Sequence, residues 1–170
     1  MSERDIKVQA IINPISGVGS KRKIPKMIEG ICSKKNCSLN ISFTEYAGHA
    51  SELTRQAIEE GAEYILAVGG DGTVNEIARA MIHSNAILGI IPKGSGNCLA
   101  RELHIPMDVK RAIDLIAKGH VTTIDCCRAN GQVFFCTCGV GFDAAVSQKF
   151  ANEKRRGSLT YIKNTIEEYL

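Results

Sequence analysis

Four apolar segments, each followed by a segment with helical periodicity, constrain the fold of this 170-residue chain more than any other feature. The apolar segments predict strands at residues 7–12, 39–44, 64–68 and 87–91. Apolar residues three and four positions apart predict helices at residues 24–31, 50–60, 73–81 and 109–117. Because each crossover between parallel strands returns over the sheet by way of a helix, this order predicts an α/β fold with an open, mostly parallel sheet and helices on both faces.

The pattern changes after Gly119. The later segments are predicted as two strands and a helix, at residues 121–127, 133–138 and 159–169. Two strands and one helix neither close a sheet nor cover its edge. We therefore expect residues 1–120 to form one α/β domain, and residues 121–170 to begin a second, β-rich domain that this chain leaves incomplete.

Composition and charge exclude several classes of protein. No apolar run approaches the roughly 18 residues of a membrane span, and the charged N-terminus lacks the apolar core of a secretory signal, so we expect a cytoplasmic location. The net charge of +3 is too small to indicate nucleic acid binding. The basic clusters are predicted to be solvated faces, with attraction to phosphates or to an anionic membrane surface as the alternative. They comprise Lys21, Arg22, Lys23 and Lys26, and residues 154–156.

The seven cysteines are an odd number and include no Cys-x-x-Cys pair, which argues against a disulfide framework. The last four, Cys126, Cys127, Cys136 and Cys138, fall in the two late predicted strands. We expect thiols buried in a strand pair. A zinc site is the alternative.

Residues 69–73, Gly-Gly-Asp-Gly-Thr, join the predicted strand at 64–68 to the next helix. Three glycines around one aspartate allow a tight turn and close approach of the backbone to a ligand. Amides at the helix N-terminus then point at the ligand, an arrangement that suits phosphate. Asp71 is placed to hold a phosphate-bound Mg²⁺ or to accept a proton from an attacking hydroxyl. For Thr73 and Glu76, a capping box is the alternative role.

Other turns also follow strand ends. The turn Pro-Lys-Gly-Ser-Gly-Asn follows the last of the four strands; its Gly94 allows a tight path, and Ser95 and Asn97 supply a hydroxyl and an amide for a ligand. Residues 13–20 follow the first strand, and Thr44 ends the second. Ligands of parallel sheets bind beyond the carboxyl ends of the strands, so these turns are predicted to line one cleft and to serve nucleotide chemistry.

Together these motifs resemble the diacylglycerol kinase catalytic-domain family, which includes bacterial lipid kinases and sphingosine kinases. The main matches are Asn13-Pro-x-Ser-Gly, Gly69-Gly-Asp-Gly-Thr-Val-Asn-Glu76 and Pro92-x-Gly-Ser-Gly-Asn97-x-Leu-Ala-Arg101. Thr44-Glu-Tyr-Ala-Gly-His-Ala50 and Val140-Gly-Phe-Asp-Ala144 extend the resemblance. NAD kinases share the Gly-Gly-Asp-Gly-Thr loop but not the Gly-Ser-Gly-Asn-x-Leu-Ala-Arg segment.

The resemblance implies an ATP- and Mg²⁺-dependent kinase that transfers the γ-phosphate to a lipid hydroxyl, such as that of diacylglycerol or a sphingoid base, at a membrane surface. Residues 1–120 would bind the nucleotide and residues 121–170 would begin the acceptor domain; a homodimer is the expected assembly. Thr44 would lie near the adenosine, and Asp71 near the phosphates and Mg²⁺, where it is also the candidate base. The residues that would hold ATP are Asn13, Ser16, Thr44, Gly69, Gly70, Asp71, Gly72, Thr73, Val74, Asn75, Glu76 and Ser95.

The sequence departs from the family pattern in two ways. Cys98 stands where bacterial lipid kinases usually carry aspartate, and Ser95 replaces their commoner threonine; both favour the sphingosine-kinase-like branch. Family members also have a full second β-rich domain, so we expect this chain to bind nucleotide and to turn over poorly or not at all. An NAD kinase-like enzyme and a catalytically inert nucleotide-binding fragment are the alternatives.

Overall fold

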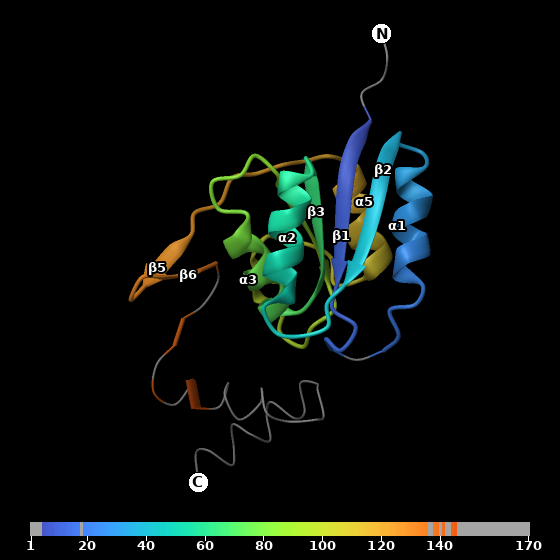
Figure 1. Cartoon of the computed structure of the whole chain (residues 1–170). Coiled ribbons are helices and arrows are strands. Elements are labelled where there is room, and N and C mark those ends of the chain that lie inside the picture. Colours follow the sequence, from blue (N-terminus) through green and yellow to red (C-terminus); the bar gives the residue numbers. More distant parts are fainter. Residues whose placement is uncertain (1–4, 18, 136–137, 140, 142–143, 146–170) are drawn as a thin grey trace.

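The computed structural model has a four-stranded sheet at its centre, with the strand order β2-β1-β3-β4 (Figure 1). It describes residues 5–17, 19–135, 138–139, 141 and 144–145. The strands are β1 (Ile6–Ile12), β2 (Cys37–Phe43), β3 (Tyr64–Gly69) and β4 (Ile87–Pro92). All pairings within this sheet are parallel, which confirms the predicted parallel sheet. The strand ends differ from the predicted ends by at most two residues.

Helices cover both faces of the sheet, as predicted. They are α1 (Ile24–Cys32), α2 (His49–Glu59), α3 (Asp71–Ala80), α4 (Cys98–Glu102) and α5 (Val109–Ala117). Helices α1 and α5 lie on one face and α2 and α3 on the other (Figure 1). The short helix α4, which the sequence pattern did not predict, packs with α2 and α3 through Leu99 and Ala100.

Side chains alternate between the two faces along each strand, as pleating requires. In β1, Val8, Ala10 and Ile12 belong to the core under α1 and α5, whereas Ile11 belongs to the core under α2 and α3. Burying one such aliphatic side chain stabilises a fold by roughly 1.5–3 kcal/mol. Because both faces are covered, the inner strand β3 is a continuous apolar run, and β1 is apolar from Ala10 to Ile12, after the buried Gln9.

The chain after α5 differs from the prediction. Residues 121–126 belong to no strand, and a hairpin forms only between β5 (Cys127–Ala129) and β6 (Gln132–Phe134). Its turn is Asn130-Gly131, with φ angles of +48° and +77°, which suits a type I′ hairpin turn. The predicted strand at residues 121–127 therefore overlaps β5 only at Cys127. The predicted strand at residues 133–138 overlaps β6 at Val133 and Phe134, and its residues 136–137 lie outside the described residues.

The cysteines of this region are exposed rather than buried. Cys126, Cys127 and Cys138 all face solvent as free thiols, so the prediction of thiols buried in a strand pair was wrong for these three. The hairpin has three residues in each strand, and the first two residues of β5 are exposed, so the strand pair is too small to bury these thiols.

Several predicted features lie outside the described residues: the helix at 159–169, the basic cluster at 154–156, Cys136 and most of the motif at 140–144. Within the described part of the chain, no helix is long and apolar enough to cross a membrane. The same residues include no group of three or more histidine, cysteine or acidic side chains arranged to hold a metal ion.

Candidate functional site

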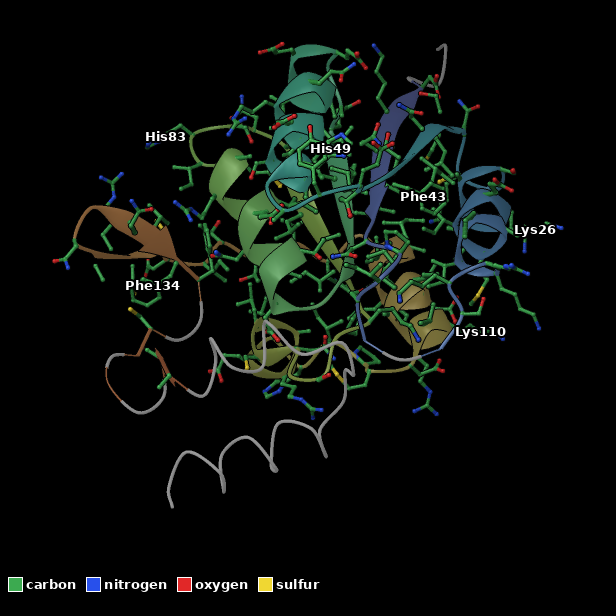
Figure 2. All side chains as sticks on the ribbon, turned by 60° about the horizontal axis from the view of Figure 1, so that its bottom comes forward. Lys26, Phe43, His49, His83, Lys110 and Phe134 are labelled. Atoms are coloured by element: carbon green, nitrogen blue, oxygen red, sulfur yellow. The ribbon has the colours of Figure 1, made fainter. Side chains whose placement is uncertain are left out.

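The carboxyl ends of β1, β3 and β4 lead into three loops that meet at one edge of the sheet. Figure 1 shows this edge at the bottom of the molecule, and Figure 2 turns it forward. We refer to residues 13–17, 69–73 and 93–97 as the loop cluster. Parallel sheets bind ligands at this edge, and the predicted convergence of the three turns is confirmed by the backbone contacts between them.

Glycines let the loops pack backbone against backbone. A Cβ added to Gly17 would lie 2.0 Å from the carbonyl oxygen of Lys93, and one added to Gly94 would lie 2.4 Å from the Cα atom of Gly70. The φ angle of Gly17 is +55°, in the region that only glycine adopts freely. Gly17 and Gly94 are thus needed because the loops contact one another. The sequence pattern had indicated only tight turns and close approach of a ligand.

A side-chain hydrogen bond joins the first loop to the second. The Nδ2 atom of Asn13 donates to Oγ1 of Thr73 over 3.0 Å, and Oδ1 of Asn13 accepts the amide of Ile15, also over 3.0 Å. Thr73 is buried against Gly69, where an added Cβ would lie 2.5 Å from the Thr73 Oγ1 atom. Asn13 therefore fixes both its own turn and the first turn of α3.

The capping box, which was the alternative role for Thr73 and Glu76, is contradicted by the start of α3. Helix α3 begins at Asp71 with Gly70 in the capping position, and no side chain accepts a hydrogen bond there. Thr73 lies within the first helical turn and its hydroxyl is bound to Asn13 instead. The helix thus starts three residues earlier than a Thr-x-x-Glu cap at Thr73 requires.

Asp71 bridges the second and third loops. Its Oδ2 atom accepts the amide of Asn97 over 2.8 Å, and its Oδ1 atom accepts the amide of Cys98 over 2.6 Å. Gly96 is needed here as well, because an added Cβ would lie 2.7 Å from Oδ2 of Asp71. The residue remains exposed, and each carboxylate oxygen can accept more than one hydrogen bond. Asp71 can therefore anchor α4 and still face a ligand.

Asn97 closes its own turn. Its Oδ1 atom accepts the amide of Gly94 and its Nδ2 atom donates to the Gly94 carbonyl, both over 2.8 Å. Its φ angle of +55° is one that asparagine tolerates better than most residues. The predicted contact of Asn97 and Ser95 with a ligand stays a prediction, while the loop-closing role of Asn97 is visible directly.

Lys21 is buried and bound to the first loop. It is 8% exposed, and its ammonium group donates to the carbonyl oxygens of Ser16 and Pro14, the latter over 3.1 Å. Burial, and then the nearby charge of Lys93, lowers the pKa of Lys21 below its usual value. A solvated face was thus the wrong prediction for Lys21. The other members of this basic cluster, Arg22, Lys23 and Lys26, are exposed, as a solvated face requires.

The start of α3 is open to an anion. The first amides of an α-helix have no partner within the helix, and here they belong to Asp71, Gly72 and Thr73. Asp71 and Gly72 are exposed, and nothing lies within 4 Å of a Cβ placed on Gly72. The helix dipole adds partial positive charge at this end. The geometry is therefore suited to binding phosphate oxygens.

The remaining predicted ligand residues lie around the cluster. Thr44 is buried just beyond the end of β2, where its amide donates to the carbonyl of Ile12 over 2.9 Å. Val74 is buried in the core under α2 and α3, so its side chain is directed away from solvent. Asn75 and Glu76 are half-buried in α3. Their contact with a ligand stays a prediction.

Sequence reasoning missed an apolar rim beside Thr44. Ile15, Phe43 and Tyr46 are 77%, 49% and 55% exposed, and they belong to the loops that follow β1 and β2 and to the last position of β2 itself. The ring of Tyr46 stacks on His49 with centroids 4.5 Å apart; Figure 2 labels Phe43 and His49 near this edge. Exposed aromatic residues at a strand end were the available signal.

The parallel sheet and the loop cluster define an α/β domain with a candidate ligand site at its carboxyl edge. Residues 7–129 match the diacylglycerol kinase catalytic domain, and the chain belongs to that family. The family is one of kinases, and kinases are phosphotransferases.

Three known proteins illustrate the similarity. A diacylglycerol kinase of Staphylococcus saprophyticus is 34% identical over 131 residues, which are 75% of this chain and 43% of that protein. An uncharacterised protein of Synechocystis is 31% identical over 93% of this chain and 39% of its own length. The crystal structure of a diacylglycerol kinase from Bacillus anthracis gives a TM-score of 0.69 at 31% identity, over 78% of this chain and 49% of that one. The chain thus spans half or less of the length of these relatives.

Proposed function

We propose that this chain is the nucleotide-binding part of an ATP-dependent lipid kinase, which transfers the γ-phosphate of ATP to a lipid hydroxyl. The family and the names of the relatives support the kinase class. The observation that carries the proposal is the loop cluster, in which three glycine-containing loops and the open start of α3 meet at the carboxyl edge of the sheet.

The chain's own residues fit a nucleotide and a magnesium ion. The amides at the start of α3 would bind phosphate oxygens, and Thr44 with the apolar rim of Ile15, Phe43 and Tyr46 would adjoin the nucleoside. Mg²⁺ is usually held by one or two carboxylates together with phosphates and water, and Asp71 is an exposed carboxylate at this position. When bound, Mg²⁺–ATP supplies the phosphoryl group and the charge neutralisation of the transfer.

Asp71 is our candidate base as well as a positioning residue. The amides of Asn97 and Cys98 orient its carboxylate, and the remaining lone pairs can accept the proton of a lipid hydroxyl. The same two hydrogen bonds connect α3 to α4. Asp71 would therefore have a structural role besides its proposed role as the base.

Diacylglycerol is the first acceptor to test, because the named relatives are diacylglycerol kinases; a sphingoid base is the second, because of Ser95 and Cys98. The acceptor side, contact with a membrane surface and a homodimer belong to the whole protein and form part of the proposal. A catalytically inert nucleotide-binding fragment is the competing candidate, favoured by the fact that the chain spans 43% of the Staphylococcus saprophyticus enzyme.

The experiment measures transfer of labelled γ-phosphate from Mg²⁺–ATP, with diacylglycerol, sphingosine and NAD as acceptors and products partitioned between organic and aqueous phases. Label in the organic phase that Asp71→Asn abolishes supports a lipid kinase. The matched control is Asp114→Asn, an exposed carboxylate on α5, which should leave transfer unchanged.

The other outcomes distinguish the alternatives. Label on NAD would replace the proposal with an NAD kinase-like activity. ATP binding without transfer would identify an inert nucleotide-binding fragment. Absence of ATP binding by the folded chain would overturn the proposal.

A further inference from the structure

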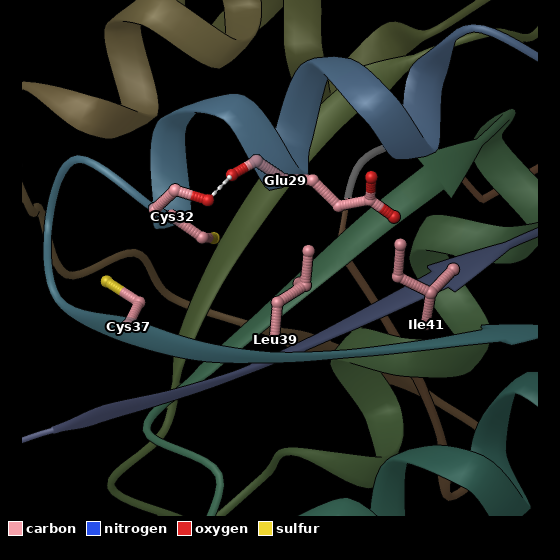
Figure 3. A pocket seen from close by; sticks show the side chains of 6 residues that line it. Glu29, Cys32, Cys37, Leu39 and Ile41 are labelled. Atoms are coloured by element: carbon pink, nitrogen blue, oxygen red, sulfur yellow. Dashed lines mark hydrogen bonds between the residues drawn. The ribbon is translucent and has the colours of Figure 1, made fainter.

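A cavity lies at the opposite edge of the sheet from the loop cluster. It has a volume of about 310 Å³ and lies between the end of α1 and the start of β2 (Figure 3). Such a volume is at the lower end for small-molecule sites. The lining residues are Glu29, Cys32, Ser33, Cys37, Leu39 and Ile41.

The secondary structure directs two thiols into this cavity. Cys32 is the last member of the buried stripe of α1, after Ile24 and Ile28. Cys37 opens β2 and belongs with Leu39 to the face that packs against α1. Figure 3 shows both thiol groups beside the cavity, one from the helix and one from the strand.

The turn between the two cysteines is short and well hydrogen-bonded. The amide of Lys35 donates to the carbonyl of Cys32 over 3.0 Å, and the Sγ atom of Cys37 lies 3.5 Å from the Lys35 carbonyl oxygen. Asn36 completes the turn with a φ angle of +53°. This turn connects the end of α1 to the start of β2, and the two thiols line one cavity.

The two thiols differ in environment. Cys32 is 7% exposed, whereas Cys37 is only half-buried. Burial, followed by the charge and the hydrogen bond of the adjacent Cys37 thiol, raises the pKa of Cys32 to about 11. A solvent-borne reagent therefore meets Cys37 first, and Cys32 stays protonated beside it. Two thiols alone do not make a zinc site, which needs four ligands.

We propose that Cys32 and Cys37 form a reversible dithiol–disulfide pair whose oxidant is a low-molecular-weight disulfide that enters this cavity. The Cys37 thiolate attacks one sulfur of the oxidant, forming a mixed disulfide and releasing one thiolate. Cys32 then attacks the Cys37 sulfur; its proton passes to a released thiolate and the second reagent thiol leaves. Two protein thiols are oxidised, and one disulfide is reduced to two thiols.

The test uses the native chain and oxidised glutathione, followed by alkylation of free thiols, trypsin digestion without reduction, and mass spectrometry. Trypsin cleaves after Lys34 and Lys35, so Cys32 and Cys37 fall in separate peptides, 27–34 and 36–55, neither with another cysteine. We expect these two peptides to be joined by a disulfide, with loss of two of the seven thiols.

Variants separate the two steps. Cys32→Ser should stop at glutathione bound to Cys37, and Cys37→Ser should leave Cys32 unmodified until the protein is denatured. Cys98→Ser is the matched control and should leave the disulfide intact. The proposal fails if wild-type Cys37 carries glutathione while Cys32 remains a free thiol, if the bond forms only among Cys126, Cys127, Cys136 and Cys138, or if nothing reacts. The wild-type peptide map decides this even where a variant does not fold.

Discussion

The loop cluster lies within the α/β core, whereas the segment from residue 121 to residue 135 comes after it in the chain. The two regions differ in how many contacts hold them in place. In the loop cluster, glycine backbones touch and polar side chains cross from loop to loop. The later segment is mostly exposed and joins α3 through a hydrogen bond from Arg79 to Gln132. The candidate site therefore takes its shape from contacts among residues 13–98, whereas the described part of the later segment lies mostly at the surface.

The largest effect should come from placing a side chain between two loops. Gly94→Ala puts a Cβ 2.4 Å from the Cα atom of Gly70, and relieving that overlap should lower the free energy of unfolding by about 2–3 kcal/mol. Urea unfolding measures it. Gly30→Ala is the control, because it lies inside α1 with nothing within 4 Å and should raise stability by about 0.5–1 kcal/mol. Equal effects of both variants would contradict the packing argument.

Removing the bridge at Asp71 should cost less. Asp71→Ala leaves the amides of Asn97 and Cys98 without their carboxylate acceptor, and water replaces it only in part, so we expect a loss of about 1–2 kcal/mol. Thermal and urea unfolding measure this loss, and ATP titration of the same variant measures the ligand contact. A variant as stable as wild type would show that α4 does not depend on the bridge.

Lys21 tests whether a buried cation holds the first loop. Lys21→Met removes the donor to the carbonyls of Pro14 and Ser16 and should lower stability at neutral pH by about 1 kcal/mol. Lys23→Met, its exposed neighbour, should change nothing measurable.

The pH dependence of Lys21 has a definite sign. The folded-state pKa of Lys21 lies below 10.5, so the unfolded chain binds this proton more tightly. The part of its stability contribution that this pKa shift controls is full above pH 10.5 and is lost as the pH falls through the folded-state pKa, whereas the hydrogen bonds to Pro14 and Ser16 act at neutral pH. The stability of wild type relative to Lys21→Met should therefore rise with pH over that window, as measured by urea unfolding of both proteins. A flat or falling difference would contradict the burial of its charge.

The smallest effect belongs to the later segment. Gln132→Ala removes the 2.6 Å hydrogen bond from Arg79, which lies at the surface, so stability should change by less than about 0.5 kcal/mol. The same unfolding assay measures it. A loss comparable to that of Gly94→Ala would show that the hairpin and the loop cluster are not so different.

The fold was predictable where residue type follows burial. Strands buried on both faces leave apolar runs, and α1, α3 and α5 leave apolar stripes, so their positions could be read closely. Helix α4 has five residues, too few for a stripe, and it starts after the left-handed Asn97. The Asn130-Gly131 turn, which was not used in the prediction, joins β5 to β6, and the apolar residues within 121–126 led to a predicted strand where the structure has none.

The site was predictable as a set of converging loops, but its internal contacts were not. A Thr-x-x-Glu pattern does not show whether Thr73 caps the helix or lies within its first turn. The hydrogen bond that occupies the Thr73 hydroxyl comes from Asn13, sixty positions away in the sequence. In the sequence Lys21 cannot be distinguished from its neighbours Arg22 and Lys23, but in the structure it is buried against the first loop. Long-range contacts of this kind have no local signature.

The double engagement of Asp71 gives the domain an internal reporter. When the Asp71 carboxylate binds a cation or a proton, it becomes a weaker acceptor for the hydrogen bonds from the amides of Asn97 and Cys98. Those amides start α4, whose Arg101 reaches back to the carbonyl of Gly96 over 2.8 Å. Occupancy of the site is thus translated into the electronic environment of two adjacent backbone groups, where magnetic resonance could read it without any label on the ligand.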